Sequence, residues 1–231
     1  MKDNSYKIEN EKLFAEWKND EFHDKNSFVK DGIIDLGIWK NQSPKILFLL
    51  KEAYTKETGE MDLTEELAES APYKNWWNAS GWIYAINELY NNKDKKPEYY
   101  ELSSWEEGNT LLKSVAVVDI KKSKGNTLSN YTDLDTYLEH DKDRLRKQID
   151  LINPNIILCG RLFNYYKAIY PEGVIEKIEE TNKCYIHNDR LIIDFWHFAN
   201  RFPKTEIFDE LCDILYTGKV FEKFSWGKEN I

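Results

Sequence analysis

Residues Ile46–Leu50 form an uninterrupted apolar run, which is entered through Pro44 and ends at the charged pair Lys51 and Glu52. Consecutive apolar residues between polar flanks are typical of a strand that is buried on both faces, as in the centre of an α/β sheet. In open α/β sheets, ligands bind just outside the carboxyl ends of the strands. Glu52 is therefore the first candidate for chemistry. Alternatively, it only begins a solvated loop or helix.

Two more apolar runs have the same form: residues 115–118, which end at Asp119, and residues 156–159, which end at Gly160. Apolar residues at helical spacing predict helices within residues 1–28, 82–90, 133–152, 163–170 and 204–216. Alternating strands and helices favour parallel strand connections. We therefore predict a three-layer α/β/α sandwich with a mostly parallel central sheet.

The remaining segments are interpreted from their turn residues and polarity. Residues 184–187 and 190–196 are expected to pair as strands, because the Asn-Asp sequence between them favours a tight turn. Residues 55–80 are polar and follow a strand directly, which is typical of a functional loop or lid. The tail from Gly218 is expected either to dock through its aromatic residues or to stay partly loose.

The chain has 231 residues and shows no repeat or linker, so we predict one domain over residues 1–231. Its formal charge of −9 argues against a protein that coats nucleic acid non-specifically, but it permits a local basic groove. No apolar run approaches the ~18 residues of a transmembrane helix, and residues 1–5 give no signal region. The three cysteines are scattered and indicate neither a disulfide framework nor a metal site. We expect a cytoplasmic protein without a membrane partner.

Polar residues follow three of the predicted strands. Glu52 and Asp119 each follow an apolar run, and His197 follows the strand predicted at residues 190–196. Because the carboxyl ends of parallel strands meet at one edge of a sheet, we expect these three side chains to converge. The sequence contains no glycine-rich phosphate loop, no Gly-x-Ser-x-Gly elbow and no histidine pair at metal-ligand spacing. Nothing in it implies a metal or an organic cofactor.

The order of these segments resembles the uracil-DNA glycosylase superfamily over roughly residues 45–205. Lys-Glu-Ala-Tyr at residues 51–54 resembles the family's first motif, a buried strand that ends in Gly-Glu-Ala-Pro or Gly-Gln-Asp-Pro-Tyr. Residues 115–119 resemble the strand that ends in a base-reading asparagine. Residues 133–160 resemble the family's helix, Asn-Pro and Ile-Ile-Leu strand, and residues 196–201 resemble the His-Pro-Ser motif that enters the DNA minor groove.

This resemblance implies a DNA glycosylase, which flips a nucleotide out of the duplex and hydrolyses its N-glycosidic bond to leave an abasic site. It gives Glu52 the role of the carboxylate that stabilises an oxocarbenium-like sugar or orients a water. It gives His197 the role of stabilising negative charge on the leaving base. The alternative for His197 is a structural histidine at a strand end.

Asp119 stands where uracil-specific relatives have asparagine. An ionised aspartate only accepts hydrogen bonds, so it suits the exocyclic amine of cytosine and not O4 of uracil. Because excision of normal cytosine would be lethal, we expect a modified cytosine, with residues 55–80 shaping room for the modification. Some phages carry hydroxymethylated or glucosylated cytosine, so an anti-phage role is predicted. The alternative is that Asp119 forms a salt bridge with Lys121 or Lys51 and reads no base.

Further departures from the family pattern concern residues that would touch DNA. Lys51 replaces a glycine, and Phe198 and Ala199 replace Pro-Ser. We expect a basic rim that holds the DNA backbone through Lys121, Lys122, Ser123, Lys124, Asn200, Arg201 and Lys204. We expect base stacking by Tyr54, Trp76 and Trp77. The alternatives are a solvated charged face for the rim, and core packing for at least one of the tryptophans.

The sequence therefore predicts a monomeric DNA glycosylase whose substrate is DNA with modified bases, including phage DNA. One alternative is a catalytically silent DNA- or protein-binding module on the same fold, which the acidic charge and the altered motifs favour. Another is a repair glycosylase for uracil or hypoxanthine. An unrelated α/β hydrolytic enzyme with Glu52 as general base is also compatible with the sequence.

Overall fold

The computed structural model describes residues 3–24, 27–54, 59–69, 75–100, 104–125 and 128–226. The strands are β1 (Val29–Lys30), β2 (Gly32–Ile33), β3 (Ile46–Leu50), β4 (Met61–Asp62), β5 (Ala116–Asp119), β6 (Ile156–Gly160), β7 (Glu176–Lys177), β8 (Cys184–His187) and β9 (Arg190–Phe195). The helices are α1 (Asp3–Asn19), α2 (Leu36–Trp39), α3 (Leu63–Glu69), α4 (Asn75–Asn91), α5 (Trp105–Leu112), α6 (Tyr131–Ile152), α7 (Phe163–Ile169), α8 (Lys204–Thr217) and the 3₁₀ helix η2 (Val220–Lys223).

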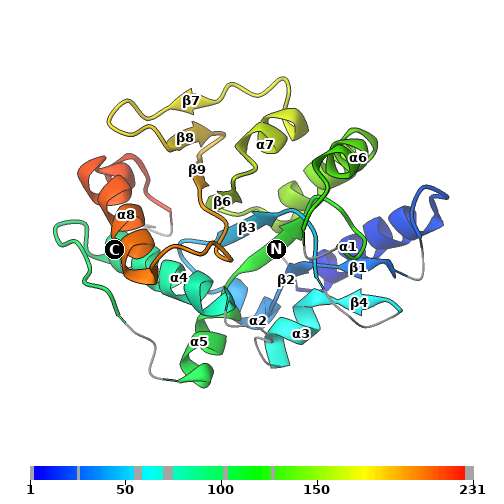
Figure 1. The fold of residues 1–231 in the computed structure, drawn as a ribbon, viewed down its shortest axis with the longest axis horizontal. Helices are drawn as coiled ribbons and strands as arrows, with labels where there is room; N and C mark the ends of the chain where they lie inside the picture. The colour runs from blue at the N-terminus through cyan, green and yellow to red at the C-terminus, as the bar shows by residue number, and fades with distance from the viewer. Residues whose placement is uncertain are drawn as a thin grey trace.

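Seven strands form a mixed sheet in the order β2-β5-β3-β6-β9-β8-β7 (Figure 1). The central strands β5, β3, β6 and β9 are parallel to one another. At one edge β2 is antiparallel to β5. At the other edge β8 is antiparallel to β9, and β7 is antiparallel to β8. The α/β prediction is confirmed, with its parallel strands confined to the middle of the sheet. A separate parallel pair is formed by β1 and β4.

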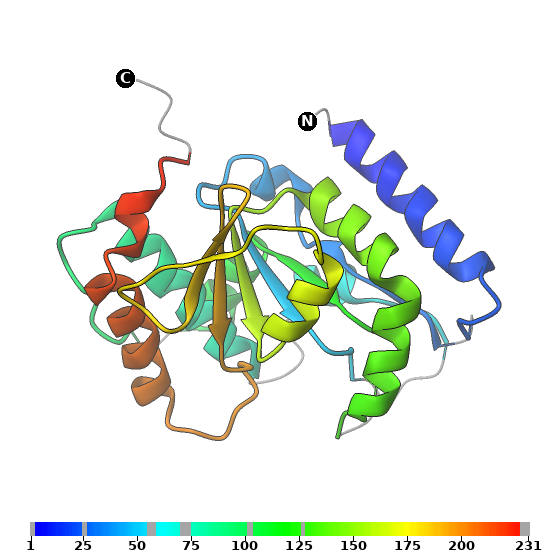
Figure 2. The ribbon, with the colours of Figure 1, turned by 90° about the horizontal axis from the view of Figure 1, so that it is seen from above.

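Helices cover both faces of the sheet, as Figure 2 shows. Along β3, Phe48 faces a core shared with α4 and α8, whereas Leu47 and Leu49 face a second core shared with α1, α6 and α7. Every residue of β3 is therefore buried, which explains its continuous apolar sequence. Each such side chain contributes roughly 1.5–3 kcal/mol through burial.

The long helix α6 ends at Ile152 as predicted and begins at Tyr131, two residues before the predicted start. The Asn130 side chain accepts hydrogen bonds from the Thr132 and Asp133 amides, which caps the first turn. At the other end Asn153 adopts a left-handed conformation with φ 51°, and Pro154 follows. This abrupt stop lets the chain turn directly into β6, beside β3.

The hairpin and the tail were also predicted correctly. Asn188 and Asp189 have φ of 50° and 59°, the left-handed pair required by a tight turn between β8 and β9. Beyond Gly218, the aromatic residues Phe221, Phe224 and Trp226 are buried. The docking prediction is therefore confirmed as far as residue 226, the last one that the structure describes.

The prediction of one long loop over residues 55–80 was wrong for its described part. This segment contains β4, α3 and the first turn of α4. A capping signal was present, because Asp62 Oδ1 accepts a hydrogen bond from the Thr64 amide at 3.0 Å. Residues 55–58 and 70–74 lie outside the described ranges. No helix within those ranges is long and apolar enough to cross a membrane.

Candidate active site

A cavity of about 510 Å³ opens at the carboxyl ends of β3 and β5. Glu52, Asp119 and His197 all line it, so the predicted convergence of the three strand exits is confirmed. The register explains this, because Leu50 pairs with Asp119 and Glu52 follows two residues later. The lining is completed by neighbours of these residues in sequence and by residues of other segments: Leu50, Lys51, Ala53, Tyr54, Met61, Leu63, Glu66, Asn75, Trp76, Leu128, Ser129, Phe198 and Ala199.

The Glu52 carboxyl group is enclosed by its neighbours, and its side chain is only 5% exposed. Oε2 lies 3.3 Å from Lys121 Nζ, whereas Oε1 is buried and has no hydrogen-bond partner among the described residues. Gly125 lies directly against this side chain, because a Cβ atom there would be 2.3 Å from Glu52 Cγ and Cδ. The Gly125 amide donates to the Ala53 carbonyl at 2.8 Å, which holds the two segments together.

Lys121 is engaged inside the protein and does not extend toward solvent. Its side chain is only 12% exposed, and Nζ is shared between two carboxylates, Glu52 Oε2 at 3.3 Å and Asp133 Oδ2 at 2.5 Å. Burial lowers the pKa of Lys121, but hydrogen bonds and charge from both carboxylates outweigh it and raise the pKa overall. The predicted contact between Lys121 and DNA is therefore replaced by an internal ion-pair network.

Asp119 is 1% exposed, and neither of its carboxyl oxygens has a hydrogen-bond partner in the described structure. Desolvation raises the pKa of Asp119 to about 8, with a further rise from Asp31, an opposing effect of Lys122 and a smaller rise from Glu52. This shift favours the neutral acid, which has one hydrogen-bond donor and one acceptor, over the ionised form that was expected. The alternative in which Asp119 forms a salt bridge with Lys121 or Lys51 was wrong, because its carboxyl oxygens have no partner among the described residues.

The prediction that Lys122 contacts DNA was wrong. Its side chain is fully buried, with Nζ 2.6 and 2.8 Å from the two oxygens of Asp31. Gln148 Nε2 also donates to Asp31, at 2.7 Å, and the Trp17 ring covers the ammonium at 5.2 Å. A buried ammonium requires such a partner, because removing a charge from water is unfavourable by several kcal/mol.

Ser123 is likewise excluded from the rim. It is 3% exposed and its hydroxyl donates to the Tyr137 hydroxyl at 3.0 Å. Within the basic run that suggested a rim, Lys122 and Ser123 are buried and Lys121 is engaged internally, and the residue types alone do not show which of them face the core. Lys124 is half-buried, and its amide donates to the Ser27 carbonyl.

His197 is held as a neutral ring with a defined tautomer. Its Nδ1 accepts a hydrogen bond from the Ala199 amide at 3.1 Å, so the ring proton lies on Nε2. Burial, aided by the charge of Lys51, lowers the pKa of His197 to about 4. Gly160 supports the ring, since a Cβ there would lie 3.2 Å from His197 Cδ2. His197 therefore offers an N–H donor at neutral pH.

Aromatic residues form one wall of the cavity. Trp76 is 6% exposed and packs against Phe198, with ring centroids 4.4 Å apart. Phe198 in turn contacts Phe48 edge-on at 5.9 Å, so the wall continues into the core. Tyr54 lies at the mouth and is 39% exposed. Trp76 and Tyr54 therefore both line the cavity, and their stacking on a base stays a prediction.

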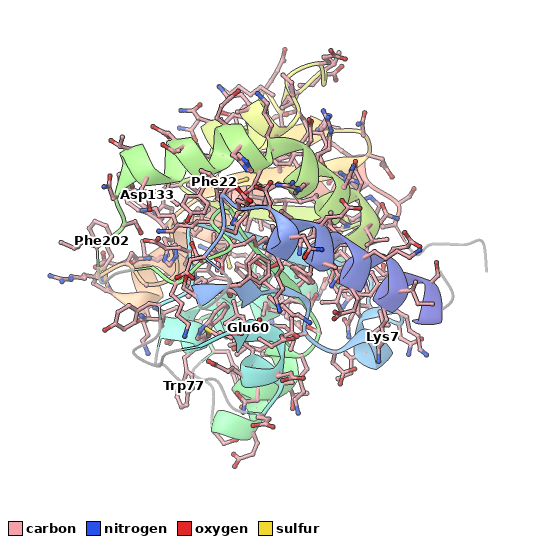
Figure 3. All side chains as sticks on the ribbon, turned by 90° about the vertical axis from the view of Figure 1, so that its right-hand side faces the viewer. Lys7, Phe22, Glu60, Trp77, Asp133 and Phe202 are labelled. Atoms are coloured by element: carbon pink, nitrogen blue, oxygen red, sulfur yellow. The ribbon has the colours of Figure 1, made fainter. Side chains whose placement is uncertain are left out.

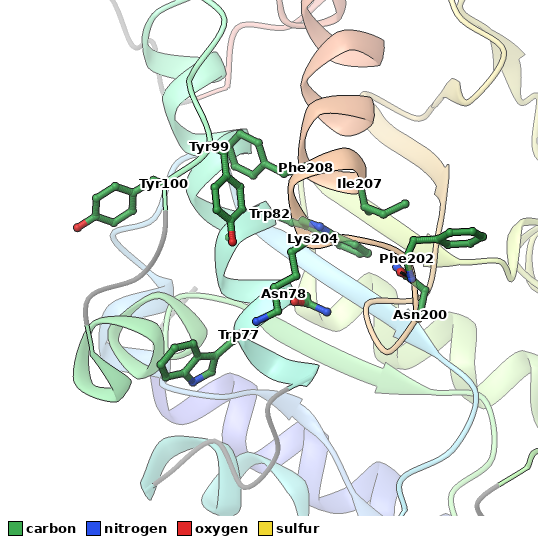
Figure 4. A pocket seen from close by; sticks show the side chains of 11 residues that line it. Trp77, Asn78, Trp82, Tyr99, Tyr100, Asn200, Phe202, Lys204, Ile207 and Phe208 are labelled. Atoms are coloured by element: carbon green, nitrogen blue, oxygen red, sulfur yellow. Dashed lines mark hydrogen bonds between the residues drawn. The ribbon is translucent and has the colours of Figure 1, made fainter.

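Trp77 is in a different place from the prediction. It lines a separate, smaller hollow of about 30 Å³ with Asn78, Tyr99, Phe202 and Lys204 (Figure 4). Lys204 Nζ is 5.9 Å from the centroid of the Trp77 ring. Successive residues of a helix point about 100° apart, and here this rotation directs Trp77 away from the active-site cavity that Trp76 lines.

The loop after His197 is ordered by Asn200. Its Nδ2 donates to the His197 carbonyl at 3.0 Å, and its Oδ1 accepts from the Phe202 amide at 3.0 Å. Asn200 is therefore a loop-capping residue, in contrast to the predicted phosphate contact. Arg201 is exposed, as the rim prediction requires. Phe202, labelled in Figure 3, is 52% exposed beside it.

Outside the cavity, His23, His140 and Asp141 bring ligand-type atoms within 4.8 Å of one another. The geometry favours a hydrogen-bonded network over a metal site. Arg144 Nη1 already lies 3.0 Å from Asp141 Oδ1, which places a cation at this carboxylate. His23 Nε2 and His140 Nδ1 lie 3.0 and 3.1 Å from its oxygens.

Sequence reasoning missed three residues that shape the site: Asp31, Gly125 and Gly160. The two glycines were a usable signal, because Gly125 follows the segment after Asp119, Gly160 ends β6, and glycine permits close approach. Asp31 gave no such signal, since its partners lie far away in sequence. Comparison of the chain with protein-family models, with curated proteins and with solved structures found no match. The assignment of function therefore depends on the geometry of this cavity.

Proposed function

We propose that the protein is a DNA glycosylase that excises a modified cytosine, such as glucosylated hydroxymethylcytosine, and leaves an abasic site. The observation that carries the proposal is one cavity lined by Glu52, Asp119 and His197. The parallel strands with helices on both faces agree with the resemblance to the uracil-DNA glycosylase superfamily. Such an enzyme would serve in defence against phages whose DNA carries this base.

In the proposed reaction, Glu52 acts on the sugar side of the glycosidic bond. The bond between C1′ and the base nitrogen breaks, and its electron pair leaves with the base. Glu52 stabilises the resulting oxocarbenium-like sugar and accepts a proton from the water whose oxygen bonds to C1′. Its Oε1, which has no other partner among the described residues, is suited to this role.

His197 acts on the base side. Its Nε2–H is the free donor of a neutral ring, because Nδ1 is engaged by the Ala199 amide. A hydrogen bond from this donor to the O2 of the pyrimidine stabilises negative charge as it develops. A neutral histidine suits this purpose because it can donate this hydrogen bond without first being protonated.

Asp119 reads the base edge as a neutral acid. Its hydroxyl donates to N3 of a cytosine ring and its carbonyl accepts from the exocyclic amine, which gives two hydrogen bonds. The same neutral group also pairs with N3–H and O4 of uracil. This observation supports a second candidate function, the repair of uracil in DNA, and means that Asp119 alone does not select cytosine.

The size of the cavity favours a substituted base. Its volume of about 510 Å³ is within the range of roughly 300–1,000 Å³ of small-ligand sites, and it exceeds the space that a bare pyrimidine occupies. Met61, Leu63, Glu66 and Asn75 extend it beyond the three reactive residues. Glu66 and Asn75 are suited to hydrogen-bonding the hydroxyl groups of an attached sugar, and Trp76 gives an apolar surface for its ring.

The test is to incubate the purified protein with DNA that contains cytosine, uracil, hydroxymethylcytosine or glucosylated hydroxymethylcytosine. Abasic sites and the released base are then measured by mass spectrometry. We expect release of a modified cytosine, which Glu52→Gln and His197→Ala abolish and the exposed control Glu16→Gln leaves unchanged. Release of uracil would select the repair function. If no base is released, the protein is a silent binding module, and Glu52→Gln would leave its biological effect intact.

A further inference from the structure

The structure leaves few of the predicted rim residues available to hold the DNA backbone. Lys121 and Lys122 are engaged in internal ion pairs, and Asn200 caps its own loop. Phosphate contacts nevertheless supply most of the affinity of a protein for DNA. Other cations at the same edge of the sheet are therefore needed to hold the backbone.

A second polar pocket, of about 350 Å³, lies at the carboxyl ends of β6 and β9. We call it the Arg161 pocket, and its lining consists of Arg161, Phe163, Asn164, Lys183, Asp194, Phe195 and Trp196. It adjoins the candidate active site, because Trp196 directly precedes His197 and Arg161 directly follows Gly160, which abuts the His197 ring.

Arg161 is held in an unusual and well-defined conformation. Its φ of 62° is left-handed, which is uncommon for a residue other than glycine and is retained only where surrounding contacts enforce it. The Arg161 amide donates to the Phe195 carbonyl at 2.9 Å. The guanidinium lies 3.7 Å from the centroid of the Trp196 ring, and Trp196 Nε1 donates to Glu210 at 2.8 Å.

The pocket carries excess positive charge. Arg161 and Lys183 line it with one carboxylate, Asp194, whereas Lys167 lies outside the lining and acts on Asp194 only through its charge. No ion pair within 4.0 Å joins any of these four residues in the described part of the chain. Desolvation raises the pKa of Asp194 and the three cations lower it, with a net rise. A guanidinium stacked on an indole keeps its N–H edge free, which suits bidentate binding of a phosphate.

We propose that the Arg161 pocket binds a backbone phosphate of the DNA strand whose nucleotide enters the active-site cavity. Arg161 donates two hydrogen bonds to the phosphate oxygens, and Lys183 adds a second charge from the other side of the pocket. The proposal rests on the proposed function for its choice of DNA as the ligand. It goes beyond that function by placing the strand on the β6–β9 side of His197.

The test compares Arg161→Gln/Lys183→Gln with Lys7→Gln/Lys147→Gln, a control that removes equal charge from exposed positions of α1 and α6. Affinity for a duplex oligonucleotide is measured by fluorescence anisotropy across a salt series. We expect the pocket variant to bind about tenfold or more weakly and its salt slope to fall by about 1 to 2, with the control close to wild type. Lys183→Gln alone provides the same comparison if the double variant does not fold.

Unchanged affinity and salt slope in the pocket variant would overturn the Arg161 pocket and leave the glycosylase proposal standing. Absence of DNA binding by the wild-type protein would overturn both. If the wild-type protein binds DNA through Arg161 but forms no abasic sites in any substrate, the pocket stands and the glycosylase proposal fails.

Discussion

Lys121 Nζ lies 3.3 Å from Glu52 Oε2, and this contact fixes one oxygen of the carboxylate while the other has no partner among the described residues. Asp133 lies on the far side of the same ammonium, with Oδ2 at 2.5 Å. Lys121 therefore positions Glu52 from behind the cavity. Its place in the basic run had suggested a contact with DNA instead.

Lys121→Met should lower the rate of base release by about tenfold or more, equivalent to ~1.4 kcal/mol of transition-state stabilisation, because Glu52 loses its orienting partner. Lys121→Arg should restore part of the rate. DNA affinity should change little in either variant. A large loss of affinity with an unchanged single-turnover rate would mean that Lys121 contacts DNA after all.

Gly125→Ala should nearly abolish base release, since the new methyl group would lie 2.3 Å from Glu52 Cγ and Cδ and displace the carboxylate. Gly81→Ala is the matched control, because no heavy atom lies within 4 Å of a Cβ there. In the interior of α4 it should add roughly 0.5–1 kcal/mol to the free energy of unfolding. Equal activity of the two variants would show that Glu52 does not need its observed position.

The activity should decline as pH rises through about 8, because burial raises the pKa of Asp119 to about 8 and ionisation removes its hydrogen-bond donor. Asp119→Asn keeps a donor and an acceptor, so its pH–rate profile should lack this alkaline limb. If the decline above about pH 8 persists in Asp119→Asn, it is caused by the ionisation of another group.

The same shift affects stability. Between about pH 4 and pH 8 folded Asp119 keeps a proton that the unfolded chain releases, so the free energy of unfolding falls as pH rises through this window. The pKa of His197 is lowered to about 4, so its stabilising contribution to the free energy of unfolding is lost as pH falls from about 6.5 toward 4. Urea unfolding of wild type and Asp119→Asn across pH measures how the two free energies of unfolding differ in their pH dependence. Below about pH 4 the two should depend on pH in the same way.

Lys122→Met should destabilise the fold by about 3–5 kcal/mol, because it leaves the buried Asp31 carboxylate without its cation. For a chain of this length, a loss of that size lowers Tm by about 10 °C. Adding Asp31→Asn should restore part of the stability. The salt dependence of DNA binding should not change. A lower salt slope would show that Lys122 contacts DNA.

Residue patterns along the chain were enough to predict the buried parallel strands at the centre of the sheet and the meeting of Glu52, Asp119 and His197. Apolar runs identify buried strands, and the ends of parallel strands lie at one edge whatever side chains follow them. The turn between β8 and β9 was equally predictable, because its geometry depends on the residue types at two positions.

The environment of each ionisable group and the direction of each cation became known only from the folded chain. Asp31 pairs with Lys122 across 91 residues of sequence, and its negative charge adds to the desolvation that raises the pKa of Asp119. Arg161 faces an open pocket, whereas Lys122 is buried. Burial and partner choice depend on segments that are distant in sequence, so no local pattern encodes them.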